Sequence, residues 1–249
     1  MNVEDKGPGR FYCNFKVHKE HKHIPPPRPI TSGSGSMTEN IGTFIEHHIK
    51  DIAAKHATFL EDTPDFLRII DKLNNGPKLP ENSLIVTWDA MALFTNILHT
   101  EGLASLTRTL EKRKAKNVPT DYLVRLMELI LKYNIFEFHN GLWKQEIGAA
   151  MGSRPVPHYA DIFMSEFDDM IKVIADTYSE GESEALPLLK RFLDDYISLF
   201  VGSTKKLHQL FDEKNKINPS IQLTMSHTTL KTNLRKTNVI VSQKCQSHS

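Results

Sequence analysis

Residues 188–201 read LLKRFLDDYISLFV, an apolar stretch that the acidic pair Asp194-Asp195 interrupts. Short apolar runs next to a turn are typical of buried strands, so the stretch predicts two strands joined at the acidic pair. Two carboxylates inside an apolar run are costly to bury as bare charges. They therefore occupy a tight exposed turn, face a cationic partner or bind a metal ion.

A second carboxylate ends another apolar run. Residues 84–98 read LIVTWDAMALFTNIL, in which Asp89 follows a short predicted strand. If this strand lies beside the 188–201 hairpin, Asp89 and Asp194 meet at one edge of a sheet. Carboxylate oxygens are ligands that Mg²⁺ prefers, and two such ions about 3.5–4 Å apart can activate a hydroxyl and stabilise a leaving pyrophosphate.

Helix and loop patterns fill the rest of the chain. The proline-rich segment 24–30 forbids helix and predicts extended chain or an edge strand, and the Gly/Ser-rich segment 31–40 predicts a loop. Asn140-Gly141 predicts the turn of a hairpin over 135–147. Apolar residues at helical spacing predict helices over 38–60, 63–74, 100–113, 119–134, 156–178 and 205–216, and a last strand is predicted over 220–225.

Another acidic pair, Asp168-Asp169, lies within the helix predicted over 156–178. Acidic pairs on helices are usually solvated, and we interpret this pair as surface. The helix predicted over 38–60 has Thr38 or Asn40 as its candidate N-cap.

Four motifs occur in an order that resembles reverse transcriptases. Phe192-Leu193-Asp194-Asp195 resembles their F/Y-x-D-D motif, and residues 84–98 resemble their first catalytic motif. The sequence GAAMGS at 148–153 resembles the motif between these two, and residues 11–30 resemble the fingers. The set is similar to the reverse transcriptases of Penelope-like retroelements, a telomerase-related group of RNA-directed DNA polymerases, over about residues 11–225.

The resemblance implies an α+β fold: the right-hand polymerase palm, a small antiparallel sheet backed by helices, with partial fingers. Residues 1–82 would form the partial fingers and connecting helices, 83–226 the palm, and 227–249 an atypical basic tail. The family's thumb and its GIY-YIG nuclease are not recognisable past about Ser226. The resemblance therefore suggests a truncated copy that lacks the thumb and nuclease domains.

The resemblance also implies a catalytic role for three acids. Asp89 and Asp194 would bridge two Mg²⁺ ions, with Mn²⁺ as a substitute, and Asp195 would be a third, more peripheral acid. The reaction would be nucleotidyl transfer from a dNTP to the 3′-hydroxyl of a primer on an RNA or DNA template. Another two-metal phosphoryl-transfer enzyme, such as a nuclease, is a further alternative from the acids alone.

Other residues have implied roles in substrate binding. Lys16 and Arg28 would hold the triphosphate, and Phe94 would lie under the sugar and select deoxynucleotides. Gly148, Met151 and Gly152 would line the nucleotide region, and Arg154 would touch the template backbone. The alternatives are that the cations are solvated surface residues, that Phe94 is a core residue, and that the glycines only form turns and helix starts.

Three features favour an inactive chain, namely Ile147, the unrecognisable thumb and the atypical tail, whereas the three acids oppose it. Ile147 stands where the family usually has Gln, which puts nucleotide affinity in doubt rather than the metal site. The alternative function is a catalytically inactive remnant that at most binds nucleic acid.

Charge is unevenly distributed although the net charge is only +1. Residues 1–30 carry a net +3, residues 205–249 carry +6, and the middle carries −8. Basic ends around an acidic centre are compatible with a polyanionic partner near a metal-binding core, and solvated surface charge is the plainer alternative.

Composition excludes several classes of protein. The 249 residues include only two cysteines, Cys13 and Cys245, which rules out a disulfide framework or a thiolate zinc site. No apolar run approaches the roughly 20 residues of a membrane span, and no secretory signal begins the sequence. We expect an intracellular protein, nuclear if it is functional.

Overall fold

The structure, a computed structural model, describes residues 6–17, 23–179 and 184–229. The chain divides into two compact units, and each unit is assembled from two separated segments. The first unit comprises residues 1–55 and 92–164, and the second comprises residues 56–91 and 165–249. The domain limits suggested by the sequence follow one another along the chain, whereas these units interleave.

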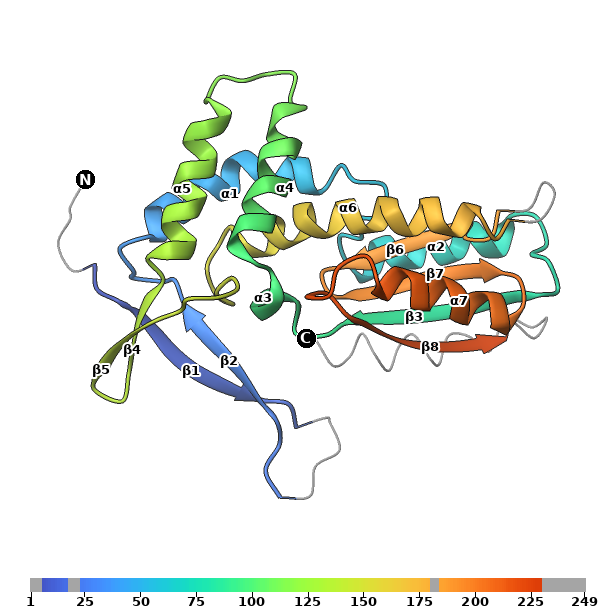
Figure 1. Cartoon of the computed structure of the whole chain (residues 1–249), viewed down its shortest axis with the longest axis horizontal. Helices are drawn as coiled ribbons and strands as arrows, with labels where there is room; N and C mark the ends of the chain where they lie inside the picture. The colour runs from blue at the N-terminus through green and yellow to red at the C-terminus, as the bar shows by residue number, and fades with distance from the viewer. Residues whose placement is uncertain (1–5, 18–22, 180–183, 230–249) are drawn as a thin grey trace. The chain divides into compact units, whose positions relative to one another are not determined.

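The second unit is built on an antiparallel sheet with the strand order β6-β7-β3-β8 (Figure 1). In the central strand β3, Leu84, Val86 and Trp88 are buried and the residues between Leu84 and Trp88 that alternate with them are half-buried, because successive strand residues face opposite sides of a sheet. The strands of this sheet are β3 (Ser83–Ala90), β6 (Leu188–Phe192), β7 (Asp195–Val201) and β8 (Leu223–Thr229). Its helices are α2 (Thr63–Asn75), α7 (Thr204–Asn215) and the later part of α6 (Val156–Asp176).

The first unit holds a mixed sheet in the order β2-β1-β4-β5, in which β1 and β4 run parallel. The proline-rich strand lies at an edge of the sheet, as the sequence predicts, because prolines cannot donate to a second neighbour. The strands are β1 (Gly9–Phe15), β2 (Pro27–Ser32), β4 (Ile135–Phe138) and β5 (Gly141–Lys144). The helices are α1 (Glu39–Ala53), α3 (Leu93–Asn96), α4 (His99–Glu111), α5 (Thr120–Lys132) and the first part of α6.

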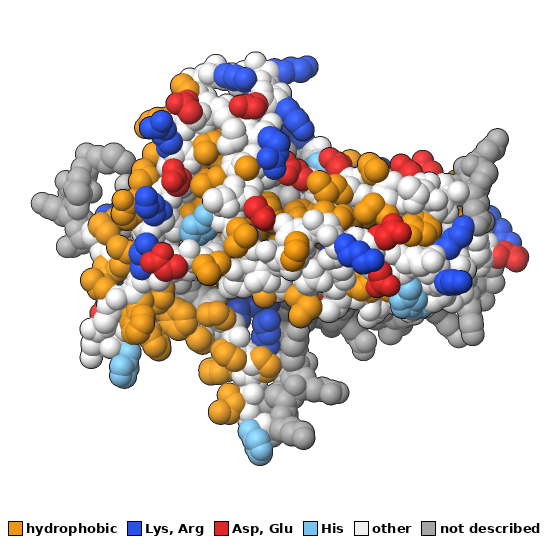
Figure 2. Space-filling view, viewed as in Figure 1, with side chains coloured by type: hydrophobic (Ala, Val, Ile, Leu, Met, Phe, Trp, Pro, Cys, Tyr) orange, Lys and Arg blue, Asp and Glu red, His pale blue; other side chains and the backbone are white. Residues whose placement is uncertain are grey.

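Hydrophobic side chains gather over β1, β4 and β5 on the face seen in Figure 2. The ring of Phe11 stacks on Phe136 with centroids 5.5 Å apart and meets Phe138 edge-on at 4.9 Å. Such aromatic contacts stabilise the pairing of short strands. Trp143 is 57% exposed and its indole nitrogen donates a hydrogen bond to the carbonyl of Phe138, which ties β5 back to β4.

The predicted α+β class is confirmed, with local differences. The β4–β5 turn consists of His139 and Asn140, whose φ angles are 51° and 61°, so Gly141 already belongs to β5. The turn therefore lies one residue earlier than predicted, and both of its left-handed positions hold non-glycine residues. The last strand covers Leu223–Thr229 rather than 220–225.

The first long helix also differs from its prediction. It ends at Ala53 instead of residue 60, because residues 54–58 form turns and a bend and Phe59 makes an isolated β-bridge with Arg191 of β6. There the Arg191 amide donates to the Thr58 carbonyl at 2.7 Å. Thr38 is at the N-cap position but its side chain makes no capping hydrogen bond. Residues 230–249 of the predicted basic tail lie outside the described residues.

Candidate active site

The predicted acids meet at one end of the sheet in the second unit. Strands β3 and β7 pair with Asp89 directly opposite Asp195. Directly opposed residues of an antiparallel pair project from the same face of a sheet. On its other side Asp89 lies opposite Thr224 of β8. Asp89 and Asp195 are therefore neighbours on one face, and both are half-buried.

Asp194 lies in the turn between β6 and β7, where only Leu193 and Asp194 separate the two strands. The amide of Ala90 donates a hydrogen bond to the Asp194 carbonyl at 2.9 Å, which ties this turn to the end of β3. Leu193 has a φ of 54°, a left-handed conformation that costs energy for a residue with a bulky side chain. The turn is thus held in a specific, strained conformation beside the acid of β3.

The three acids suit a hard divalent cation. Mg²⁺ and Mn²⁺ prefer carboxylate oxygens, and Mg²⁺ usually keeps several waters and is completed by substrate phosphates. Asp89, Asp194 and Asp195 are each partly exposed, so a hydrated ion can reach them. Within the described part of the chain, no three His, Cys, Asp or Glu side chains are gathered into a ready-made metal cluster. The three residues suit a divalent cation by the chemistry of their carboxylates and by the closeness of their backbones. Their side chains are not already gathered into a metal site.

The interpretation of Asp168-Asp169 as a surface pair is wrong for its first member. Asp168 is fully buried, whereas the side chain of Asp169 is 69% exposed. The Asp168 carboxylate accepts hydrogen bonds from Arg191 Nε at 3.0 Å and from the Tyr196 hydroxyl at 2.7 Å. Successive helical residues project about 100° apart, so neighbours on α6 can face the core and the solvent respectively.

Gly148 packs against the backbone of α3 within the first unit. A Cβ atom at Gly148 would lie 2.6 Å from both the Phe94 carbonyl oxygen and the Thr95 Cα, and its φ is 77°. The amide of Ala149 donates to the same Phe94 carbonyl at 2.6 Å. Phe94 itself is half-buried in the short helix α3, not in a strand core. Two motifs far apart in the sequence thus meet at a point where only glycine fits.

The same loop also contacts β2. The Thr31 amide donates to the Met151 carbonyl and the Gly33 amide to the Gly152 carbonyl, both at 3.0 Å. A Cβ atom at Gly152 would lie 2.7 Å from the Thr31 carbonyl oxygen, and its φ is 108°. Arg28, which is predicted to bind the triphosphate, also belongs to β2. Backbone hydrogen bonds therefore join this loop to the strand that carries Arg28.

Arg28 and Lys16 lie close together on the β1–β2 hairpin. Arg28 is opposite Asn14 in the strand register, and the Lys16 amide donates to the Pro26 carbonyl at 2.9 Å. The two cations are therefore about two register positions apart, and both are half-buried. Such a pair can engage several oxygens of one anion.

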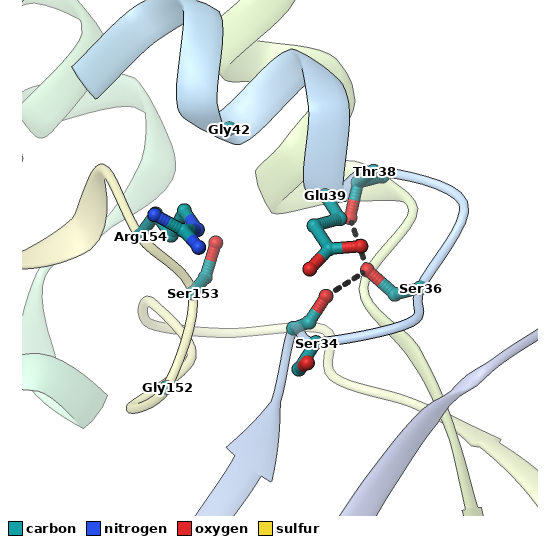
Figure 3. Close-up of a pocket in the computed structure, with 9 residues that line it drawn as sticks. Ser34, Ser36, Thr38, Glu39, Gly42, Gly152, Ser153 and Arg154 are labelled. Carbon is teal, nitrogen blue, oxygen red and sulfur yellow. Dashed lines mark hydrogen bonds between the residues drawn. The ribbon is translucent and has the colours of Figure 1, made fainter. Parts of the chain in front are cut away.

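Gly152 and Arg154 line a pocket of about 280 Å³ in the first unit (Figure 3). The Arg154 guanidinium lies 3.9 Å from the Glu46 carboxylate and is largely exposed. Glu39, on the opposite wall, accepts a hydrogen bond from Lys6, and this bond lowers the pKa of Glu39. The hydroxyl groups of the pocket come from Ser34, Ser36, Thr38 and Ser153.

His99 is a contact residue that the sequence analysis missed. Its Nε2 lies 2.7 Å from the Gly148 carbonyl oxygen, so the ring donates to the loop of residues 148–153, here named the glycine loop, when that nitrogen carries the proton. No periodicity or motif marks this histidine, since the contact depends on how the loop folds back onto the start of α4.

The predicted residues thus fall into two groups. The acids belong to the second unit, where the sheet brings them together. The predicted substrate residues and the predicted template contact belong to the first unit, where the glycine loop touches both α3 and β2: Lys16, Arg28, Phe94, Gly148, Met151, Gly152 and Arg154.

The fold resembles that of the palm and fingers regions of nucleic-acid polymerases. Solved structures of telomerases and of viral RNA-dependent RNA polymerases superpose on nearly all of the chain. The predicted palm-type fold, a small antiparallel sheet that carries acids and is backed by helices, is therefore confirmed.

Telomerase from Candida tropicalis in complex with a telomeric RNA fragment matches with a TM-score of 0.64 and 12% identity, over 94% of this chain and 42% of that one. Telomerase from Candida albicans, also with telomeric RNA, matches at 0.63 and 10%, over 94% and 44%. The RNA-dependent RNA polymerase of BmCPV at its quiescent state matches at 0.58 and 11%, over 89% and 21%. The chain therefore spans less than half the length of these polymerases.

Comparison with family models and with curated protein sequences finds no match. Among the helices that the structure describes, none combines the length and the hydropathy of a membrane span. The likeness to the polymerases is one of fold, at identities of 10–12%.

Proposed function

We propose that this chain is the palm and fingers part of an RNA-directed DNA polymerase of a Penelope-like retroelement. The observation that carries the proposal is the pairing of Asp89 with Asp195, together with the hydrogen bond that ties Asp194 to the end of β3. Acids 105 and 106 positions apart along the chain are thereby placed at one edge of one sheet. A solvated surface pair needs no such partner strand.

In the proposed reaction the 3′-hydroxyl of a primer attacks the α-phosphate of a dNTP, and pyrophosphate leaves. Asp89 and Asp194 would hold two Mg²⁺ ions, or Mn²⁺ ions, and Asp195 would complete the ligands. When bound, these ions activate the hydroxyl and neutralise the charge that develops on the pyrophosphate. The contribution of the protein is then mainly positioning and charge stabilisation.

The first unit supplies residues suited to the nucleotide. Lys16 and Arg28 lie close enough on one hairpin to bind the triphosphate oxygens of one nucleotide. The backbone around Gly148 and Gly152, with Met151 between them, is the surface proposed for the nucleotide. Arg154 remains proposed as a contact to the template backbone, since its guanidinium is largely exposed.

The test of the acids is primer extension by the full chain with Mg²⁺ or Mn²⁺, on RNA and DNA templates. Asp194→Asn should abolish extension, because a neutral amide is a poor ligand for a divalent cation. Asp212→Asn, which changes an exposed acid of α7 in the same unit, is the matched control and should extend like the parent. Undiminished extension by Asp194→Asn would refute the assignment of the acids.

The choice between DNA and RNA synthesis rests on Phe94. A ring under the sugar would collide with a 2′-hydroxyl, so Phe94→Val should raise the incorporation of ribonucleotides relative to deoxynucleotides. The ratio of the two incorporation efficiencies measures the effect. An unchanged ratio would remove Phe94 from the proposed nucleotide site.

A second candidate is an inactive remnant that binds nucleic acid only. The observation that favours it concerns Ile147, which is 62% exposed. The resembled family usually has Gln at this position, and the isoleucine side chain cannot form a hydrogen bond to a nucleotide. This candidate predicts salt-dependent retention of RNA in a gel-shift assay without any extension by the parent chain. Extension that requires Asp194 excludes it.

A further inference from the structure

A buried ion pair lies directly behind the acidic turn. The Asp168 carboxylate on α6 is fully buried and accepts hydrogen bonds from Arg191 Nε, from the Tyr196 hydroxyl and from the Thr58 hydroxyl. His56 Nδ1 lies 3.8 Å from the same carboxylate. Buried polar groups with this many partners form a rigid network.

Arg191 links this network to the turn. Its Nε bonds Asp168, and its Nη1 donates to the Leu193 carbonyl at 3.0 Å. The backbone of Arg191 is also fixed, because its amide donates to Thr58 and its carbonyl accepts from Leu60 at 2.9 Å. The guanidinium is a planar fork, so it can serve both acceptors without moving.

The turn needs such an anchor. Leu193 is held at a φ of 54°, which is unfavourable unless the surroundings enforce it. Arg191 holds the Leu193 carbonyl from the core side, and the Ala90 amide holds the Asp194 carbonyl from the neighbouring strand. Both hydrogen bonds hold the backbone of the turn that carries Asp194.

We propose that Asp168 and Arg191 are positioning residues that fix the acidic turn for metal binding, an inference that rests on the proposed function. The alternative is that the pair serves stability alone. Stability is a weak reason for a buried ion pair, since replacing both charges together is often neutral. The hydrogen bond from Arg191 to Leu193 gives the pair a second task that an apolar replacement cannot perform.

The decisive variant is Asp168→Asn combined with Arg191→Met. It removes both charges of the pair together, so neither of them is left buried without the other, and the amide introduced at position 168 would still accept from Tyr196. Methionine fills the volume of the arginine stem but cannot donate to the Leu193 carbonyl. Tyr196→Phe is the matched control, because it removes one hydrogen bond to Asp168 and keeps Arg191, with its hydrogen bonds to Asp168 and Leu193.

The measurement is Mn²⁺ binding by the full chain, followed by electron paramagnetic resonance, with thermal unfolding recorded for each variant. We expect the double variant to melt within a few degrees of the parent and to bind Mn²⁺ about 10-fold or more weakly, the scale typical of residues that orient metal ligands. Tyr196→Phe should stay within about 2-fold of the parent. A folded double variant with parental Mn²⁺ affinity overturns the inference.

Two further variants keep the test complete. Asp194→Asn separates the inference from the proposed function: Mn²⁺ binding that does not depend on Asp194 overturns the proposed metal site, whereas binding that needs Asp194 but not the pair overturns only the positioning role. If the double variant does not fold, Arg191→Lys replaces it. Lysine has one nitrogen in place of the fork and should weaken Mn²⁺ binding several-fold, and parental affinity in that variant also overturns the inference.

Discussion

Gly148→Ala tests the contact between the glycine loop and α3. The added methyl would lie 2.6 Å from the Phe94 carbonyl oxygen, 2.6 Å from the Thr95 Cα and 2.7 Å from the Thr95 carbonyl oxygen, all of them backbone atoms that cannot rotate away. Alanine at a φ of 77° costs about 1–2 kcal/mol. Relieving the overlap by moving backbone costs about 1–3 kcal/mol more. The free energy of unfolding should therefore fall by about 2–5 kcal/mol in total.

Gly35→Ala is the matched control for this prediction. Gly35 has a φ of 75°, and a Cβ atom there would meet nothing within 4 Å. The free energy of unfolding of this variant should therefore fall only by the cost of the left-handed conformation. Urea unfolding of the parent and both variants, followed by circular dichroism, gives the comparison. If the two alanine variants lose the same stability within about 0.5 kcal/mol, the close approach of residue 148 to α3 is refuted.

The other predictions concern a buried lysine and a helix cap in the second unit. Burial lowers the pKa of Lys214 from 10.5 to about 7, so between these pH values the unfolded chain binds more protons than the folded one. The free energy of unfolding of the parent, relative to Lys214→Met, should therefore rise with pH across that window by up to about 1.4 kcal/mol per pH unit. Urea unfolding at a series of pH values measures this, and a difference that does not change with pH would contradict the lowered pKa of Lys214. Asp62→Ala should cost about 1 kcal/mol in thermal unfolding, because the Asp62 carboxylate caps α2 by accepting from the Asp65 amide at 2.7 Å. An unchanged melting temperature in Asp62→Ala would show that the cap contributes nothing.

The meeting of the acids could be predicted because it follows from strand geometry. A carboxylate that ends one apolar strand and a second that interrupts an apolar hairpin come to the same end of a sheet once the strands pair antiparallel. The sequence predicted Asp194 as the neighbour of Asp89, whereas the residue opposite Asp89 is Asp195 and Asp194 lies in the turn. The register depends in part on which face of each strand is buried, and the alternation in β3 disfavours a register shifted by one residue.

The burial of Asp168 was not predicted, although the spacing of apolar residues along α6 indicates it. Asp168 follows Met164 by four residues and precedes Ile171 by three, and both of these side chains are fully buried. Helical spacing therefore placed Asp168 on the inner stripe of α6 and Asp169 beside it on the outside. An acidic residue on such a stripe requires a buried cation, and Arg191, inside an apolar strand, was the available one.

Other contacts had no counterpart in the sequence pattern. The shift of the β4–β5 turn to His139-Asn140 depends on which residues pair across the hairpin, and Asn140-Gly141 alone suggests the later position. The hydrogen bond from His99 to Gly148 joins a helix start to a loop that only the folded chain brings near. Such contacts depend on tertiary structure rather than on local propensity.

The interleaved units have a consequence for anyone who divides this gene. A fragment that stops at residue 164 keeps both segments of the first unit but also carries β3, now without β7 and β8 on either flank. That orphaned apolar strand would offer two open edges to other molecules and promote aggregation. Excising residues 56–91 and joining residues 55 and 92 through a flexible linker would keep both segments of the first unit and leave out the orphaned strand.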